Sequence, residues 1–155
     1  MDVFSDLLPH EAVFHDMGAA SKKALFQSVA GLAGKLYALD QRQIGDRLGE
    51  REKLGSTGFG GGVAIPHGKI EGLARVVGLF AKLAQPMDFA AIDGLPVDLV
   101  FILLSPPDAG VDHLKALARV SRRLRDRAFV AKLRGAGSAD ALYALFASGE
   151  SRDAA

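Results

Sequence analysis

Residues 96–107, PVDLVFILLSPP, contain the longest run of large aliphatic and aromatic residues in the chain, from Leu99 to Leu104. A run like this, without alternating polar residues, predicts a β-strand that is buried on both faces. Such a strand needs neighbouring strands on its edges and other elements above and below it. The run is far shorter than the roughly 20 apolar residues of a membrane-spanning helix. A layered fold around a central sheet is therefore expected.

The rest of the chain alternates between helical and strand patterns. Ser21 is the expected N-cap of a helix with one apolar face, formed by Leu25, Val29, Leu32 and Leu36. A second helix is expected from Gln41 to Leu54, ending at Gly55. Residues 63–70 predict a brief edge strand, and residues 74–86 a longer one rich in β-branched and aromatic residues. Both strands precede the buried run.

The C-terminal third is predicted to be mainly helical. Asp93 and Gly94 form a turn signal before the buried strand, and the helical pattern runs from Val111 to Arg125. Ser138 is the expected cap of a last helix, whose apolar face carries Leu142, Leu145 and Phe146. These patterns predict a single-domain α/β sandwich over residues 1–148, followed by a polar tail over residues 149–155.

Composition excludes several classes of function. The chain has no cysteine, which rules out thiol nucleophiles, disulfides and thiolate metal sites. Its formal net charge is +1, which gives no electrostatic support to a nucleic-acid partner. The N-terminal residues are acidic and lack the apolar core of a signal peptide, so a cytoplasmic protein is expected. His10 and His15 are one residue too far apart for the HExxH zinc motif, so both are expected to be structural and no metal site is predicted.

A glycine-rich loop, GSTGFGGGVAIPHGKIEG, spans residues 55–72. It does not match the phosphate-binding loop of nucleotide hydrolases, because Val63 stands where the first glycine belongs and Ile70 where a hydroxyl residue belongs. It does not match the dinucleotide fingerprint either, since Val63 also replaces the third glycine. No nucleotide cofactor is therefore predicted. The simplest alternative is a tight connection between two elements.

His67 is the only residue of this loop that can hold or transfer a proton near neutral pH. An isolated loop histidine is more often structural or merely exposed, but here Pro66 stiffens the preceding segment and Gly68 permits a close backbone approach. About three quarters of an unperturbed imidazole is neutral at pH 7. If a backbone group holds one ring nitrogen, the other is free to attack. His67 is therefore a candidate phosphoryl acceptor.

Two further side chains are candidates for the same site. Arg51 shares a helical face with Ile44 and Leu48, so its guanidinium needs either a structural ion pair or a bound anion. His113 lies in the first turn of a helix, where anions are favoured, although a half-buried structural histidine is the simpler explanation. A basic run follows, which predicts either a solvated face or a docking surface for an acidic partner or nucleic acid: Arg119, Arg122, Arg123, Arg125 and Arg127.

The segment EREKLGSTGFGGGVAIPHGKIEGL resembles the active-site segment of IIA proteins of the fructose/mannitol class, which belong to the phosphoenolpyruvate-dependent phosphotransferase system. The likeness is greatest to the nitrogen-regulatory members of that class. PMDFAAIDGLPVDLVFILLSPP and HLKALARVSRRLRD extend the resemblance over nearly the whole chain. The combination of these motifs is highly specific. One departure is Gly61, where many relatives carry asparagine.

The resemblance implies a fold, a set of site residues and partners. The implied fold is a mixed β-sheet flanked by helices, without metal or nucleotide cofactor. His67 would become a tele-phosphohistidine, Arg51 would stabilise the phosphoryl group, and His113 would be the second active-site histidine. The donor would be an HPr/NPr-type phosphocarrier that Enzyme I charges from phosphoenolpyruvate. Hydroxyl and backbone groups would shape the phosphoryl pocket: those of Ser56, Thr57, Gly58, Gly60, Gly62 and Gly68.

Three functions remain open on this basis. The favoured one is a phosphohistidine carrier that regulates partners by its phosphorylation state, with transporters or sensor kinases as the kind of target implied by family analogy. The second is a sugar-transport IIA subunit that passes the phosphoryl group to a IIB domain. The third is a protein-binding module whose histidine is never phosphorylated. Neither insertion into a membrane nor binding to nucleic acid is expected for any of them.

Overall fold

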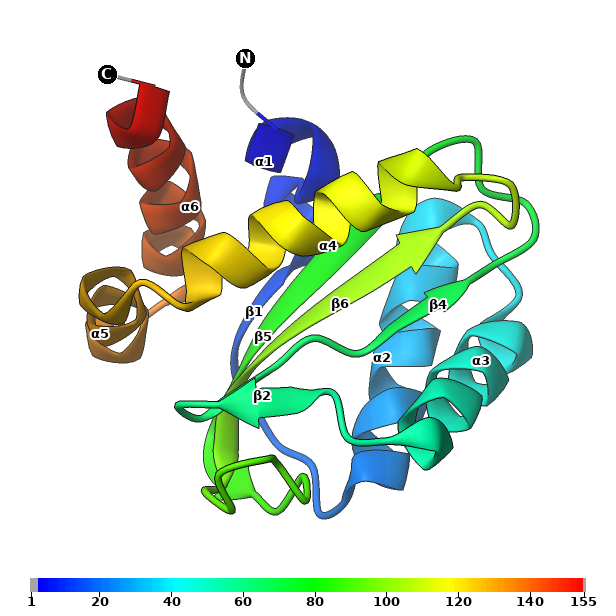
Figure 1. Ribbon diagram of the computed structural model, residues 1–155, viewed down its shortest axis with the longest axis horizontal. Helices are drawn as coiled ribbons and strands as arrows, with labels where there is room; N and C mark the ends of the chain where they lie inside the picture. Colours follow the sequence, from blue (N-terminus) through cyan, green and yellow to red (C-terminus); the bar gives the residue numbers. More distant parts are fainter. Residues whose placement is uncertain (1–2, 155) are drawn as a thin grey trace.

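The computed structural model describes residues 3–154, which surround one six-stranded mixed sheet (Figure 1). The order along the sheet is β1-β5-β6-β3-β2, and β4 also pairs with β6. β5 runs antiparallel to β6, whereas β3 and β4 run parallel to it. The predicted α/β fold with a central mixed sheet is confirmed. The strand bounds are β1 Val13–Met17, β2 Gly58–Gly60, β3 Val63–Ala64, β4 His67–Lys69, β5 Val77–Met87 and β6 Val97–Ser105.

β6 is the buried strand that the sequence predicts. Every residue from Leu99 to Leu104 is at most 1% exposed. β5 covers one edge of β6, and β3 and β4 share the other edge. Every backbone N–H and C=O group of a buried strand needs a hydrogen-bond partner, and the strands on both edges of β6 supply these partners. β6 can therefore be buried along an uninterrupted apolar run.

Capping residues set the ends of several helices. The Ser21 hydroxyl accepts from the Ala24 amide at 3.1 Å, and the Ser138 hydroxyl accepts from the Ala141 amide at 3.1 Å, as predicted from the sequence. Asp40 and Asp126 cap two further helices in the same way. The helices are α1 Val3–Leu7, the short 3₁₀ helix η1 His10–Ala12, α2 Lys22–Tyr37, α3 Gln41–Leu54, α4 Val111–Leu124, α5 Arg127–Gly135 and α6 Ala139–Ala154.

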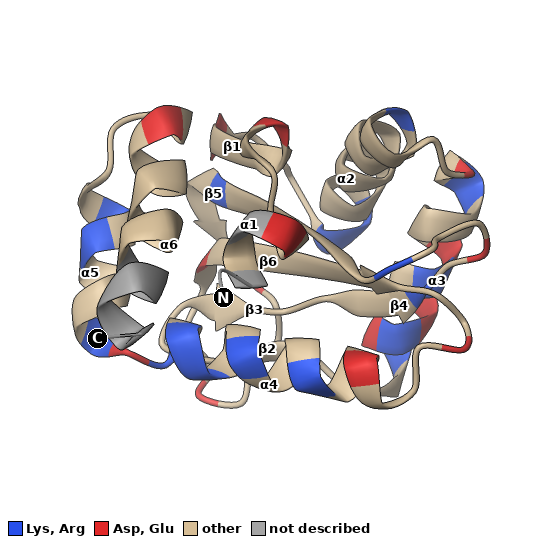
Figure 2. Ribbon diagram, turned by 90° about the horizontal axis from the view of Figure 1, so that it is seen from above, with Lys and Arg blue, Asp and Glu red and all other residues tan. Residues whose placement is uncertain are grey.

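The helices cover both faces and the ends of the sheet. α4 crosses one face and α2 lies on the other, as the two perpendicular views show (Figures 1 and 2). α3 packs beside β4. α6 packs against β1, and it also contacts α1 and α5. Five phenylalanines meet where α6 joins the sheet, because the ring of Phe146 lies 5.0–5.9 Å from four others: those of Phe4, Phe80, Phe101 and Phe129.

Several elements differ from the sequence prediction. The single edge strand expected over residues 63–70 is two strands, β3 and β4, and only β4 is an edge. Five elements were not predicted at all: α1, η1, β1, β2 and α5. α6 continues to Ala154, through the segment expected as a polar tail. None of the helices within residues 3–154 is long and apolar enough to cross a membrane.

The turn between β2 and β3 has room for glycine or asparagine at position 61. Gly61 has φ 67° and open space around its Cα, so an asparagine fits this left-handed position. Its contacts are made by the backbone: its amide donates to Asp93 at 2.9 Å and its carbonyl accepts from Arg134 at 2.7 Å. Gly62, at φ 81°, lies against the Arg134 guanidinium, where a Cβ would clash. A side chain at position 62 would therefore have to displace the Arg134 guanidinium, whereas one at position 61 would not.

Phe146→Ala tests the aromatic cluster that anchors α6. We expect a loss of about 3–5 kcal/mol in the free energy of unfolding, because the change leaves a cavity among four rings. Urea denaturation followed by circular dichroism measures the loss. Leu145→Ala is the matched control at a partly buried neighbouring position. An equal effect of both changes would show that the cluster does not hold α6.

Candidate functional site

His67 opens β4, and its position is set by the pairing of this strand with β6. It lies opposite Leu103 in the register, and the Leu103 amide donates to the Pro66 carbonyl at 2.9 Å. The next residue, Gly68, faces α3 so closely that a Cβ there would lie 3.2 Å from the Cβ of Arg47. The close approach predicted for this glycine is therefore present, and it brings the last turns of α3 beside the histidine.

The two nitrogens of the His67 ring have different partners. Nδ1 lies 2.8 Å from the Ile65 carbonyl oxygen. A carbonyl oxygen can only accept, so Nδ1 carries the ring proton and Nε2 is unprotonated, with its lone pair as an acceptor. Arg51 donates from Nε to this Nε2 at 3.2 Å, and from Nη1 to the Gly55 carbonyl at 2.8 Å. The ring is thus fixed in one tautomer, with its nucleophilic nitrogen turned toward a cation.

His113 lies beside this pair, with its ring centroid 5.5 Å from that of His67. It belongs to the first turn of α4 and is 8% exposed. Its Nδ1 is 2.6 Å from the hydroxyl oxygen of the fully buried Ser105, the last residue of β6. Ser105 was not singled out from the sequence, although a serine that ends an apolar run is a detectable signal.

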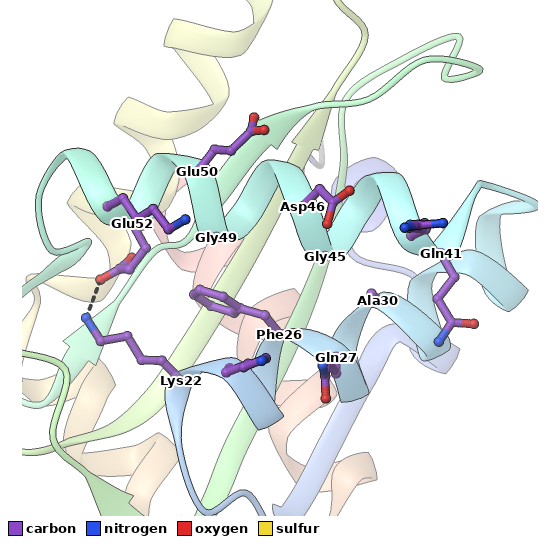
Figure 3. A pocket seen from close by; sticks show the side chains of 13 residues that line it. Lys22, Phe26, Gln27, Ala30, Gln41, Gly45, Asp46, Gly49, Glu50 and Glu52 are labelled. Atoms are coloured by element: carbon purple, nitrogen blue, oxygen red, sulfur yellow. Dashed lines mark hydrogen bonds and ion pairs between the residues drawn. The ribbon is translucent and has the colours of Figure 1, made fainter.

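The three predicted residues Arg51, His67 and His113 share an open cavity of about 400 Å³. A larger groove of about 790 Å³ lies between α2 and α3, but no histidine lines it (Figure 3). The small cavity also includes Arg47, Glu50, Leu54, Gly68 and Lys69.

The predicted pocket residues of the glycine loop are arranged differently. Gly68 lines the His67 cavity, whereas Gly58, Gly60 and Gly62 belong to the β2–β3 hairpin and are not among its lining residues. The Ser56 hydroxyl donates to the Phe89 carbonyl, and the Thr57 hydroxyl donates to Glu52. The structure therefore places these two hydroxyls in contacts that brace the loop.

Glu52 is a second residue near the site that was not predicted from the sequence. It follows Arg51 directly, and it binds both Thr57 and Lys22. The contact with Lys22 joins residues 30 positions apart, so only the folded chain reveals it.

Burial and neighbouring charges lower the pKa of both histidines. For His67, burial has the largest effect and Arg51 lowers the pKa further, while the Ile65 carbonyl and Glu52 act in the opposite direction. For His113, burial again leads, followed by the charges of His67 and Lys69. Because both pKa values fall below the ordinary 6.5, both rings are mainly neutral at pH 7. A neutral Nε2 is the form that can attack phosphorus.

The basic run, for which the sequence predicts either a solvated face or a docking surface, does not lie on a single solvated face. Arg123 is buried and lies over the Phe129 ring at 4.7 Å, and Arg125 lies over Phe59 at 5.3 Å. The outward basic residues extend along α4, with an acidic residue nearer its N-terminal end (Figure 2). They include Lys115 and Arg122.

Neither His10 nor His15 belongs to the site. His10 instead pairs with Asp140 of α6 at 2.6 Å, on the surface. Among the side chains that the structure describes, no three His, Asp or Glu groups gather in a way that could hold a metal ion. The site's chemistry is thus that of a nucleophilic imidazole, an adjacent guanidinium and a second imidazole.

Comparison with known families gives one match over most of the chain. Residues 6–149 match a family model described as the phosphoenolpyruvate-dependent sugar phosphotransferase system, EIIA 2. Two relatives are named nitrogen regulatory proteins. That of Bradyrhizobium diazoefficiens is 48% identical over 143 residues, covering 92% of this chain and 94% of the relative. That of Escherichia coli is 40% identical over 147 residues, covering 94% of this chain and 90% of the relative.

Solved structures show the same fold. The crystal structure of nitrogen regulatory protein IIA-Ntr from Neisseria meningitidis is 36% identical, with a TM-score of 0.86 over 92% of this chain and 98% of that one. The crystal structure of IIA mannitol from Escherichia coli is 21% identical, with a TM-score of 0.76 over 90% of this chain and 99% of that one. At that identity the second likeness concerns the fold alone.

The lowered pKa of His67 predicts how the ring titrates. In an NMR titration of the His67 imidazole, we expect the pH at the midpoint to lie below 6.5. An unstructured histidine peptide, which titrates near 6.5, is the control. A midpoint at or above 6.5 would contradict the burial of the neutral ring.

The same shift predicts a dependence of stability on pH. Below about pH 6.5 the unfolded chain binds a proton at this position before the folded protein does, so the free energy of unfolding should fall as the pH falls. Urea denaturation between pH 7.5 and pH 5 should show a smaller fall for His67→Gln than for the wild type. Equal falls would assign the pH dependence to other groups.

Proposed function

Because the chain belongs to the EIIA 2 family of the phosphoenolpyruvate-dependent phosphotransferase system, we propose that it accepts a phosphoryl group on His67 from an HPr/NPr-type carrier. The family matches the resemblance found in the sequence, and relatives that are 40–48% identical are named nitrogen regulatory proteins. The chain is accordingly a regulatory IIA protein of this system. Its phosphorylation state would control partner proteins, in a relay that we place in the cytoplasm.

One observation carries the assignment of the acceptor atom. The Ile65 carbonyl holds the proton of His67 on Nδ1, which leaves Nε2 as the unprotonated nitrogen that can act as the nucleophile. Arg51 lies 3.2 Å from this atom, where its guanidinium can turn from the ring to the oxygens of an incoming phosphoryl group. These contacts favour a tele-phosphohistidine.

The transfer follows from this geometry. The lone pair of Nε2 attacks the phosphorus of a phosphohistidine on the donor, in line with the bond that breaks. The donor imidazole takes back the electron pair of its nitrogen–phosphorus bond, and Nδ1 of His67 keeps its proton throughout. Arg51 stabilises the negative oxygens, the main contribution that proteins make to phosphoryl transfer. Since one N–P bond replaces another, the step is nearly balanced and reversible.

The surface around the site supports docking of a carrier protein. Three large apolar side chains near the cavity are exposed: Leu54 by 86%, Val111 by 62% and Leu114 by 64%. Leu54 itself lines the cavity, and Val111 and Leu114 flank His113 in sequence. Exposed apolar groups around a reactive centre are typical of a protein–protein contact.

Two other functions are separated by experiment. A sugar-transport IIA protein would pass the group to a IIB domain, and one solved structure with this fold is a complex of IIA mannitol with phosphorylated IIB mannitol from Escherichia coli. Phosphate transfer from this chain to a fructose- or mannitol-type IIB domain would favour that function. Partner binding that is the same before and after incubation with the relay would favour the binding module.

The decisive test is intact mass spectrometry after incubation with phosphoenolpyruvate, Enzyme I and an HPr-type carrier. We expect one acid-labile phosphate on the wild type and on His15→Ala, and none on His67→Ala, because only the last change removes the nucleophile. A folded wild type that gains no phosphate from several carriers would overturn the proposed function. Phosphate on His67→Ala would overturn the assignment of the acceptor.

Arg51→Ala should slow acceptance by about 100-fold, because the cation that stabilises the phosphoryl oxygens is lost. The domain should stay folded, since Arg51 is only partly buried and donates to one side chain and one carbonyl. Rapid-quench measurements of the phosphorylated fraction give the rate, and circular dichroism checks the fold. A wild-type rate in Arg51→Ala would remove this arginine from the mechanism.

A further inference from the structure

Glu52 has an unusually confined carboxylate for a residue near the end of a helix. Its side chain is only 7% exposed. Three donors reach it: Lys22 Nζ at 2.8 Å, the Thr57 amide at 3.1 Å and the Thr57 hydroxyl at 2.6 Å. A confined charge of this kind is costly unless such partners compensate it. Figure 3 shows the ion pair between Lys22 of α2 and Glu52 of α3.

The same contacts connect Glu52 to two loops. Lys22 also donates to the Phe89 carbonyl at 2.8 Å, and its ammonium lies 4.8 Å from the centre of the Phe89 ring. The Ser56 hydroxyl donates to this carbonyl as well, at 2.5 Å. The segment from Ser56 to Thr57 is therefore held from both sides, by Glu52 and by the loop that contains Phe89.

This braced segment leads directly to the phosphoryl site. Gly55 lies between the end of α3 and Thr57, and its carbonyl accepts from Arg51 Nη1 at 2.8 Å. The Nε of the same guanidinium is 3.2 Å from Nε2 of His67. The place of the Gly55 carbonyl, and with it the direction of the guanidinium, therefore depends on how the segment up to Thr57 is held.

We propose that Glu52 is a positioning residue for phosphoryl transfer, which acts with Lys22 and Thr57 to hold the Gly55 carbonyl and so align Arg51 on Nε2 of His67. This role rests on the proposed function of the site. Glu52 does not touch the phosphoryl group, since its carboxylate is directed to Thr57 and Lys22 and would repel an anion. The Thr57 hydroxyl, which donates to Glu52, supports the site through this carboxylate.

Glu52→Gln tests the role, because it keeps the size of the side chain and removes its charge. We expect kcat for acceptance from a phosphorylated HPr-type carrier to fall about 10-fold, since small displacements of catalytic groups have effects of this order. KM for the carrier should change less than about 2-fold, because the docking surface is intact. Asp46→Asn is the matched control: Asp46 lies on the same helix, is exposed, and makes no side-chain hydrogen bond or ion pair with the side chains that the structure describes.

An Arg51→Ala background separates positioning from a general loss of stability. If Glu52 acts through Arg51, then Glu52→Gln should lower kcat less than about 2-fold further when Arg51 is already absent. A residue that only stabilises the fold would lower kcat by the same factor in both backgrounds. Equal factors would therefore overturn the inference.

Thr57 supplies a second pair of variants if Glu52→Gln folds poorly. Thr57→Val removes the hydroxyl that donates to Glu52 and should lower kcat, whereas Thr57→Ser keeps the hydroxyl and should restore it to within about 2-fold of the wild type. Wild-type kcat in both Glu52→Gln and Thr57→Val, with phosphate still accepted on His67, would overturn the positioning role alone. A wild type that accepts no phosphate would overturn the proposed function together with this inference.

Discussion

The burial of β6 is the constraint on which the rest of the molecule depends. Its apolar residues require partners on both edges and both faces, and those partners bring the functional groups together. β4 pairs with one edge and places His67 opposite Leu103. At the end of β6, the Ser105 hydroxyl lies 2.6 Å from Nδ1 of His113. One strand therefore locates both histidines, although neither belongs to it.

The helices place and orient the other side chains around these histidines. α3 passes close to β4 because Gly68 has no side chain, and this proximity puts the guanidinium of Arg51 beside the imidazole. The guanidinium donates to the Gly55 carbonyl in the next loop and to His67 of β4, and α4 adds His113, so the site combines α3 and its following loop with β4 and the first turn of α4. Such a site needs no deep cavity, because its proposed substrate is a group carried on the surface of another protein.

The features that could be predicted from the sequence are those with local signals. The apolar run of β6, the Ser21 and Ser138 caps, and the helix from Gln41 to Leu54 were all recognised in this way. β2, β3 and β4 contain only two or three residues each, which is too few for a periodic pattern to appear. α5 begins at Arg127, shortly after α4 ends. Its N-cap, Asp126, lies among the arginines of the basic run and therefore gives no clear signal that a new helix begins. The motif located His67, Arg51 and His113, whereas the contacts of Glu52 with Lys22 and of His113 with Ser105 exist only in three dimensions.

The hydrogen bond from Nδ1 of His67 to the Ile65 carbonyl has a consequence for how partners would distinguish the two forms of the protein. A phosphoryl group on Nε2 would leave that bond, and the strand that carries it, in place. The two forms would then share one backbone and differ in a concentrated negative charge next to an apolar surface. A partner that senses this charge would discriminate by electrostatic potential, whose reach shrinks to about 8 Å at physiological ionic strength. Recognition would thus be short-ranged, and its selectivity would weaken as salt is added.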